Sequence, residues 1–165
     1  MKNVFSKDVS EFLSLLERHE VRYLIVGGEA VIYYGHARLT GDIDIFYERT
    51  AENVRRLYAA LNEFWLNDIP GITNEDELMQ KGTIFQFGVP PNRIDLINEI
   101  EAVGFEKAWE DKVRESLSYK NREVTIYYIG LKELIKNKKA VGRYKDMEDL
   151  AFLKNVHSRS RKKRG

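Results

Sequence analysis

The 165-residue sequence predicts an α/β fold, in which a mixed β-sheet is flanked by helices and followed by a short C-terminal helical part. Two observations favour this class. Short runs at 23–26 and 42–47 have the apolar character of strands, and each is followed by a segment with the periodicity of a packed helix. The sequence shows neither an internal repeat nor a second-domain boundary. One domain is therefore predicted over 1–156, with a basic, disordered tail over 157–165.

The composition indicates a cytoplasmic globular protein. Apolar residues make up 43% and charged residues 32% of the chain, as expected for a folded core beneath a charged surface. The 27 basic and 26 acidic residues nearly cancel, so the chain as a whole carries no field that attracts nucleic acid. Without cysteine, disulfides and thiolate chemistry are excluded. No apolar run approaches the roughly 20 residues that a membrane span requires, and the first residues lack the apolar core of a signal peptide.

Two amphipathic helices with N-caps are predicted in the first half of the chain. Lys7–Arg18 carries apolar residues at i, i+3, i+4 and i+7, and Ser6 precedes it as the N-cap. Ala51–Phe64 repeats this pattern after Thr50. Both helices are predicted to pack on the sheet with their apolar faces.

A β-hairpin is predicted in the middle of the chain. Strand-like runs at 83–89 and 93–97 flank Pro90-Pro91-Asn92, which is a tight-turn sequence. The segment 66–82 before it is predicted to be irregular, apart from a short helix over 74–80. The remaining predicted elements are a mixed helical segment over 98–113, an irregular piece from 116 that leads into a strand over 124–129, and helices over 131–140 and 145–155.

The most informative stretch runs from Gly27 to Asp44. A strand ends at the pair Gly27-Gly28, a short helical segment follows over 29–34, and the next strand begins with Asp42-Ile43-Asp44. Because side chains alternate along a strand, both aspartates point to the same face and repel each other unless a cation lies between them. Mg²⁺ meets that need, since it takes one or two carboxylates together with water and substrate phosphate. The glycine pair lets the backbone approach a phosphate at a helix N-terminus.

This arrangement of Gly27-Gly28, thirteen residues and an Asp-x-Asp strand resembles the signature of the nucleotidyltransferase superfamily that shares the DNA polymerase β palm. The flanking sequences, Val26 to Ala30 and Arg38 to Asp44, are most similar to small prokaryotic members, including those of toxin–antitoxin and abortive-infection modules. The resemblance implies a palm-type mixed sheet and an enzyme that moves a nucleoside monophosphate from a nucleoside triphosphate (NTP) to an acceptor hydroxyl on RNA, tRNA or protein. It also implies two Mg²⁺ or Mn²⁺ ions. From the short chain length we further expect an antitoxin or other partner subunit that supplies recognition or restraint.

Three carboxylates are the predicted metal ligands and catalytic residues. The resemblance implies that Asp42 and Asp44 bridge the ions and the nucleotide phosphates, and the alternative is a pair of solvated carboxylates at the start of a strand. Asp95 stands between two apolar residues of a predicted strand, where an unpaired charge is rare. The resemblance makes it the third ligand, which helps the acceptor hydroxyl to lose its proton. The alternative is an ordinary salt bridge with Arg93 or Arg38.

Five residues are predicted to bind the nucleotide: Gly27, Gly28, Arg38, Thr40 and Lys139. Many members of the superfamily that the chain resembles carry serine at the position of Gly28, so backbone N–H groups would hold the triphosphate here. Arg38 contacts phosphate or forms a surface ion pair, and Thr40 contacts the nucleotide or only shapes the turn. Lys139 fits the lysine of a C-terminal signature in these small transferases, although the helix dipole alone would favour a lysine there.

Two other functions stay open at the level of the sequence. One is a nucleotide-binding module of the same fold without turnover, which the missing serine hydroxyl allows. The other is a nucleic-acid adaptor that relies on the basic tail, where Arg159 to Arg164 would attract phosphates. Labelling of an acceptor by a nucleotide separates the enzyme from both alternatives.

Overall fold

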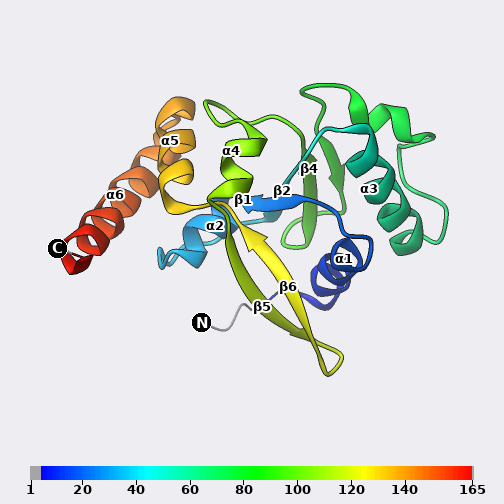
Figure 1. Cartoon of the computed structure of the whole chain (residues 1–165), viewed down its shortest axis with the longest axis horizontal. Helices are drawn as coiled ribbons and strands as arrows, with labels where there is room; N and C mark the ends of the chain where they lie inside the picture. Colours follow the sequence, from blue (N-terminus) through cyan, green and yellow to red (C-terminus); the bar gives the residue numbers. More distant parts are fainter. Residues whose placement is uncertain (1–4, 165) are drawn as a thin grey trace.

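The fold is given by a computed structural model that describes residues 5–164. Six strands form one mixed sheet in the order β3-β4-β2-β1-β6-β5, with helices around it (Figure 1). The predicted α/β class with a mixed sheet is therefore confirmed. In chain order the elements are α1 (Lys7–Arg18), β1 (Tyr23–Val26), α2 (Gly27–Tyr33), β2 (Asp42–Tyr47), α3 (Ala51–Phe64), the 3₁₀ helix η1 (Glu75–Met79), β3 (Phe85–Phe87), β4 (Arg93–Ile97), α4 (Phe105–Glu110), β5 (Val113–Tyr119), β6 (Arg122–Tyr128), α5 (Leu131–Val141) and α6 (Tyr144–Arg164).

The two N-capped helices have the predicted bounds. The hydroxyls of Ser6 and Thr50 each accept a hydrogen bond of 3.2 Å from the backbone N–H three residues further on. Each bond satisfies one of the N–H groups in the first turn that has no acceptor within its helix. α1 and α3 lie side by side (Figure 1). The rings of Phe12 and Phe64 meet edge to face between them, with centroids 5.4 Å apart. Together they form one helical layer against the sheet.

β2 runs through the middle of the sheet and carries the acidic pair. It lies between β1, which is antiparallel to it, and β4, which is parallel. Ile43, Ile45 and Tyr47 are buried, and Asp42 and Asp44 alternate with them and point to the opposite face. Burying an aliphatic side chain of this size contributes about 1.5–3 kcal/mol. The buried face of β2 thus fixes the direction in which its aspartates point.

The largest error of the sequence prediction lies between residues 98 and 129. The helix expected over 98–113 is confined to α4, and the segment expected to be irregular forms β5, which pairs with β6 along its whole length. Lys120 and Asn121 make the two-residue turn between them with φ of 48° and 61°. β5 is an edge strand of the sheet, so many of its side chains stay in water and can be polar. Because its sequence is polar, β5 is not detected when strands are predicted from apolar runs.

The C-terminal helices are longer than expected. α5 ends at Val141, where Gly142 at φ +63° forms a left-handed C-cap that glycine adopts without strain. α6 then continues to Arg164, so the described residues of the predicted disordered tail, 157–164, form part of this helix. The reason is composition, since these residues include neither glycine nor proline and are rich in arginine and lysine, which are good helix formers. None of the helices in residues 5–164 combines the length and apolarity needed to cross a bilayer.

Smaller differences concern the ends of elements. α2 begins at Gly27, two residues earlier than expected, and β3 covers only Phe85–Phe87 of the predicted 83–89. The short helix predicted over 74–80 is η1. The predicted hairpin is confirmed, because β3 and β4 pair in antiparallel fashion. β4 also pairs with β2, and this second pairing positions the residues of the candidate site.

Candidate active site

Three carboxylates from two neighbouring strands meet on one face of the sheet. Asp42 and Asp44 lie on β2, Asp95 lies on β4, and the parallel register sets Asp44 directly beside Asp95. One carboxylate oxygen from each residue lies within 4.8 Å of the other two. Oxygen atoms this close are the ligand set that a hard divalent cation prefers. The fold therefore brings together the three acids that the sequence singles out.

The electrostatics of this cluster favour a cation. Burial, followed by the charges of Asp42 and Asp95, raises the pKa of Asp44 to about 7, which marks a carboxylate whose charge is poorly compensated. Arg93 compensates the negative charges of the two other carboxylates. Its Nη2 donates to Asp42 Oδ2 at 2.6 Å, and its Nε donates to Asp95 Oδ1 at 3.0 Å. The salt bridge considered as the alternative role of Asp95 thus exists. Asp44, however, has no ion pair with any residue that the structure describes.

Gly27 lies directly against the carboxylate of Asp44. Its φ of +64° is in the left-handed region, and a Cβ at this position would come within 2.1 Å of Asp44 Oδ2. Val26, the residue before it, is paired with Asp44 across β1 and β2. The turn formed by Gly27 and Gly28, which we name the glycine corner, therefore follows directly after the last paired residue of β1. Both the conformation and the close approach require glycine here.

The space beside Gly28 is filled by two side chains from the loop before β2. A Cβ on Gly28 would lie 2.8 Å from Thr40 Oγ1 and 3.0 Å from Arg38 Nη2. The Thr40 hydroxyl donates to the backbone carbonyl of Asp42 at 3.2 Å and lies 3.3 Å from its carboxylate Oδ1. The Thr40 hydroxyl therefore lies directly beside Gly28.

We expect Gly28→Ser to lower the melting temperature, because the new side chain would collide with Thr40 and Arg38, and overpacking of this kind costs about 1–3 kcal/mol. Adding Thr40→Ala to this variant should recover part of the loss by vacating the space. Thermal unfolding of the two single variants and the double variant measures this coupling. Gly104→Ser is the control, since a Cβ at Gly104 has no atom within 4 Å. Strictly additive losses in the double variant would contradict the shared space.

A buried ion network joins the loop before β2 to α5 and α6. Arg38 Nη2 donates to Asp149 Oδ2 at 3.1 Å, and Lys138 Nζ lies 3.2 Å from the same oxygen. Lys138 also donates to Asp146 Oδ1 at 2.9 Å, while Arg143 Nε donates to Asp146 Oδ2 at 2.6 Å. The side chains of Lys138, Asp146 and Asp149 are 5%, 0% and 2% exposed. This network fixes the positions of three cations beside the acidic cluster.

The network makes a testable contribution to stability in acid. Burial would raise the pKa of Asp146, but the hydrogen bonds from Arg143 and Lys138 outweigh it and lower the pKa to about 2. A folded-state pKa below the unfolded value means that this carboxylate stabilises the fold above about pH 4 and loses that contribution as the pH falls toward 2. We therefore expect Asp146→Asn to lower the melting temperature at pH 7, by an amount that shrinks toward pH 2. A destabilisation that is constant from pH 7 to pH 2 in circular-dichroism melts would contradict this account.

The acids, the glycine pair and the network cations share one pocket of about 440 Å³. That volume lies within the range of roughly 300–1,000 Å³ typical of small-molecule sites. Its charged lining residues are Asp42, Asp44, Asp95, Arg38, Arg93, Lys138, Arg143 and Lys145. A pocket that contains both a carboxylate cluster and several cations suits a ligand made of a metal cation and a polyphosphate.

Lys138 lines this pocket together with Lys145, whereas the predicted Lys139 does not. Lys139 is exposed and does not line the pocket, whereas Lys138 is only 4% exposed and does. A sequence signal for Lys138 exists: it falls on the stripe of α5 formed by Leu131, Leu134 and Val141, where a lysine needs a buried partner. Asp149, which pairs with Arg38 and Lys138, carried no signal in the sequence, and Arg93 was predicted only as a salt-bridge partner of Asp95.

The comparison with known families agrees with this site. Residues 6–156 match a family described as "Nucleotidyltransferase of unknown function (DUF6036)". The match includes the glycine corner, the three acids and the buried ion network, and it confirms the superfamily that the sequence motif indicated. No curated protein matches the chain. The chain therefore belongs to this family of nucleotidyltransferases of unknown function.

Proposed function

We propose that this protein transfers a nucleoside monophosphate from an NTP to an acceptor hydroxyl, using divalent ions held by Asp42, Asp44 and Asp95. The observation that carries the proposal is the meeting of these three carboxylates in a pocket that also contains the glycine corner and five cationic side chains. Membership of a nucleotidyltransferase family supports the reaction class. The metal, the NTP and the acceptor are parts of the proposal.

The residues of the pocket fit Mg²⁺ or Mn²⁺. The three carboxylates supply oxygen ligands, and the raised pKa of Asp44 marks a negative charge that a cation would stabilise. For all three acids to face an ion, Arg93 has to release Asp42 and Asp95. When bound, such ions neutralise the charge of the triphosphate and make the acceptor hydroxyl more acidic.

The remaining pocket residues hold and orient the triphosphate. Arg38 is fixed by Asp149, and Lys138 is fixed by both Asp146 and Asp149, so their positive charges are positioned before any ligand arrives. The Thr40 hydroxyl lies between the glycine corner and Asp42, and it can turn from the Asp42 carbonyl to donate to a phosphate oxygen. Groups that are held in place in advance stabilise developing charge without reorganisation at the moment of reaction.

The reaction is a displacement at the α-phosphorus. The acceptor oxygen forms a bond to the α-phosphorus while the bond from that phosphorus to the bridging oxygen breaks, and pyrophosphate leaves with the bridging oxygen. The proton of the acceptor hydroxyl passes to solvent with the help of Asp95, which is 5% exposed and faces the same pocket. This reaction needs no covalent protein intermediate, so the pocket contributes positioning and charge neutralisation.

Nucleotide labelling tests the proposal. The protein is incubated with each α-³²P-labelled NTP in turn, Mg²⁺ or Mn²⁺, and either total RNA or cell lysate. We expect at least one NTP to label a macromolecular acceptor, and EDTA or Asp42→Asn to prevent labelling. The matched control is Asp68→Asn, which removes an exposed carboxylate outside the pocket. If NTP and metal raise the melting temperature but no acceptor is ever labelled, the protein is a nucleotide-binding module without turnover.

A further inference from the structure

The positive charge of the chain is concentrated in its last two helices. Residues 131–165 contain 12 basic and 4 acidic residues, a net charge of +8, whereas residues 1–130 contain 15 basic and 22 acidic residues, a net charge of −7. The near-neutral total therefore conceals a strong separation of charge. α5 and α6 lie side by side at one side of the molecule (Figure 1). We name residues 131–164 the basic arm.

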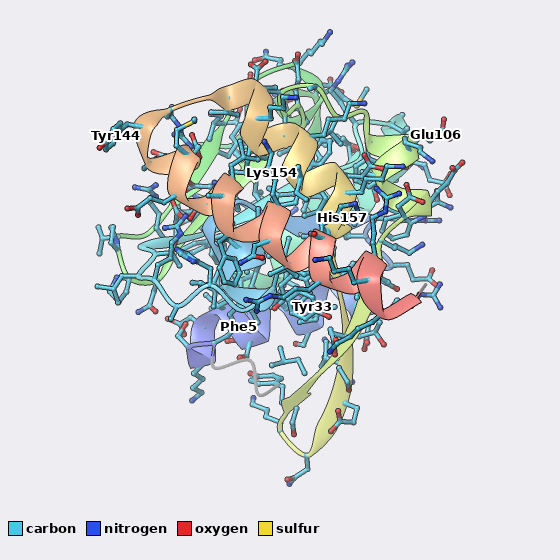
Figure 2. All side chains as sticks on the ribbon, turned by 90° about the vertical axis from the view of Figure 1, so that its left-hand side faces the viewer. Phe5, Tyr33, Glu106, Tyr144, Lys154 and His157 are labelled. Atoms are coloured by element: carbon cyan, nitrogen blue, oxygen red, sulfur yellow. The ribbon has the colours of Figure 1, made fainter. Side chains whose placement is uncertain are left out.

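The basic arm reaches the candidate active site where α5 ends and α6 begins. Arg143 and Lys145 line its pocket, and Tyr144 between them is 94% exposed. Figure 2 shows Tyr144 projecting outward at the start of α6, with Lys154 further along the same helix. From Lys145 to Arg161 the helix covers about 24 Å, at about 1.5 Å per residue. A ligand that extends from the pocket along α6 meets increasing positive charge, because the sequence contains no acidic residue after position 149.

A hollow between α5 and α6 gathers basic side chains from α6. Its volume is about 410 Å³, and it is lined by Ile135, Lys154, His157, Ser158, Arg161 and Lys162. The five residues from α6 recur at i, i+3, i+4, i+7 and i+8, which places them on one face of the helix. On α5 the exposed residues Lys132, Lys136 and Lys139 lie on the same stripe as Ile135. The cations that line the hollow come from α6, and α5 adds exposed lysines on the helix face that carries Ile135.

We propose that the basic arm binds the phosphodiester backbone of the acceptor, and that this acceptor is an RNA whose single-stranded end enters the active-site pocket. The inference rests on the proposed transfer reaction and specifies its acceptor as a terminal ribose hydroxyl, which loses its proton and joins the α-phosphorus as pyrophosphate leaves. Lys154, Arg161 and Lys162 contact phosphates. The exposed ring of Tyr144 stacks on a base at the mouth of the pocket, as aromatic side chains do in single-strand binding sites.

The composition of the last part of the arm, residues 154–164, favours nucleic acid over a protein or a membrane surface. Residues 154–164 contain no aromatic residue and only one large aliphatic residue, Val156. A protein interface normally has an apolar centre with aromatic anchors, and a membrane-surface helix needs a continuous apolar face. Arginine and lysine without such a face match the regular negative charge of a phosphate backbone.

RNA binding can be measured without nucleotide or metal. The 165-residue chain is titrated in EDTA with a single-stranded RNA of about 20 nucleotides between 50 and 200 mM salt. We expect the variant Lys154→Gln/Arg161→Gln/Lys162→Gln to reduce the slope of log K against log salt by about 2, since each phosphate contact on a single strand contributes about 0.7. The matched control, Lys7→Gln/Arg55→Gln/Lys81→Gln, removes the same side-chain types from exposed positions outside the arm and should keep the slope. Tyr144→Ala should weaken binding at least about fivefold with the slope unchanged.

The outcomes separate this inference from the transfer reaction. The triple variant of the arm should keep the rise in melting temperature caused by NTP and metal, because its three residues lie outside the active-site pocket. RNA binding that is absent at 50 mM salt, or that falls equally in the control triple variant, would overturn the inference. Tighter binding of a single-stranded DNA of the same sequence would overturn the assignment to RNA. RNA binding as expected, without labelling by any NTP, would support the surface and refute the transfer reaction.

Discussion

Asp44→Asn should abolish nucleotide transfer and leave the metal-free fold intact. Asp44 is the central acid of the cluster, because it shares β2 with Asp42 and lies beside Asp95 on β4. Loss of even an outer partner of a metal site typically costs 10–100-fold, so loss of a ligand should lower kcat/KM by at least about 10²-fold. Asparagine keeps the shape of the side chain and removes one of three mutually repelling charges. The melting temperature in EDTA should therefore equal or exceed that of the wild type.

The transfer rate with labelled NTP and the melting curve in EDTA measure the two halves of this prediction. Asp68→Asn, outside the pocket, should be neutral in both measurements. Transfer by Asp44→Asn within tenfold of the wild type would show that Asp44 is not a ligand. A large drop of its melting temperature in EDTA would show that the carboxylate stabilises the fold, contrary to its raised pKa.

Gly27→Ala should both destabilise the protein and suppress transfer. A Cβ at Gly27 would overlap the Asp44 carboxylate, with 2.1 Å between the Cβ and Oδ2, and it would occupy a backbone conformation at φ +64° that costs a non-glycine residue about 1–2 kcal/mol. Asp44 can relieve the overlap only by turning away from Asp42 and Asp95. We expect transfer to fall by at least about 10²-fold, since a misplacement of about 1 Å is enough for such a loss.

Gly71→Ala is the matched control for this prediction. Gly71 has φ +75°, close to that of Gly27, but a Cβ there would meet no atom within 4 Å. The control therefore carries the conformational strain without the collision. Thermal unfolding and NTP labelling should show a moderate loss of stability with normal transfer for Gly71→Ala. Equal behaviour of the two variants would mean that the contact between Gly27 and Asp44 is unimportant.

The acidic cluster could be predicted because its signals are local. The period of two along β2 places Asp42 and Asp44 on one face, and the glycine pair marks the end of β1. Asp95 stood out as a charge between apolar neighbours in a strand. Its position beside Asp44 depends on the parallel register of β2 and β4, which no residue pattern in the sequence encodes directly.

Other parts of the site depend on contacts between distant segments. Arg38 and Asp149 are 111 residues apart in the sequence, and only the packing of α6 against the loop before β2 joins them. Lys138 and Lys139 are adjacent lysines, and the apolar stripe of α5, on which Lys138 alone falls, is the sequence signal that distinguishes them. The edge strand β5 and the basic end of α6 were missed because polar composition was read as irregular structure or disorder.

The most direct test of the central claim is a crystal structure with Mn²⁺ and an NTP analogue that cannot be cleaved between the α- and β-phosphates. We expect anomalous scattering from manganese among Asp42, Asp44 and Asp95, with the triphosphate beside the glycine corner and the Arg93 guanidinium turned away from the acids. Manganese and nucleotide bound outside this pocket, with Arg93 still bridging Asp42 and Asp95, would contradict the account.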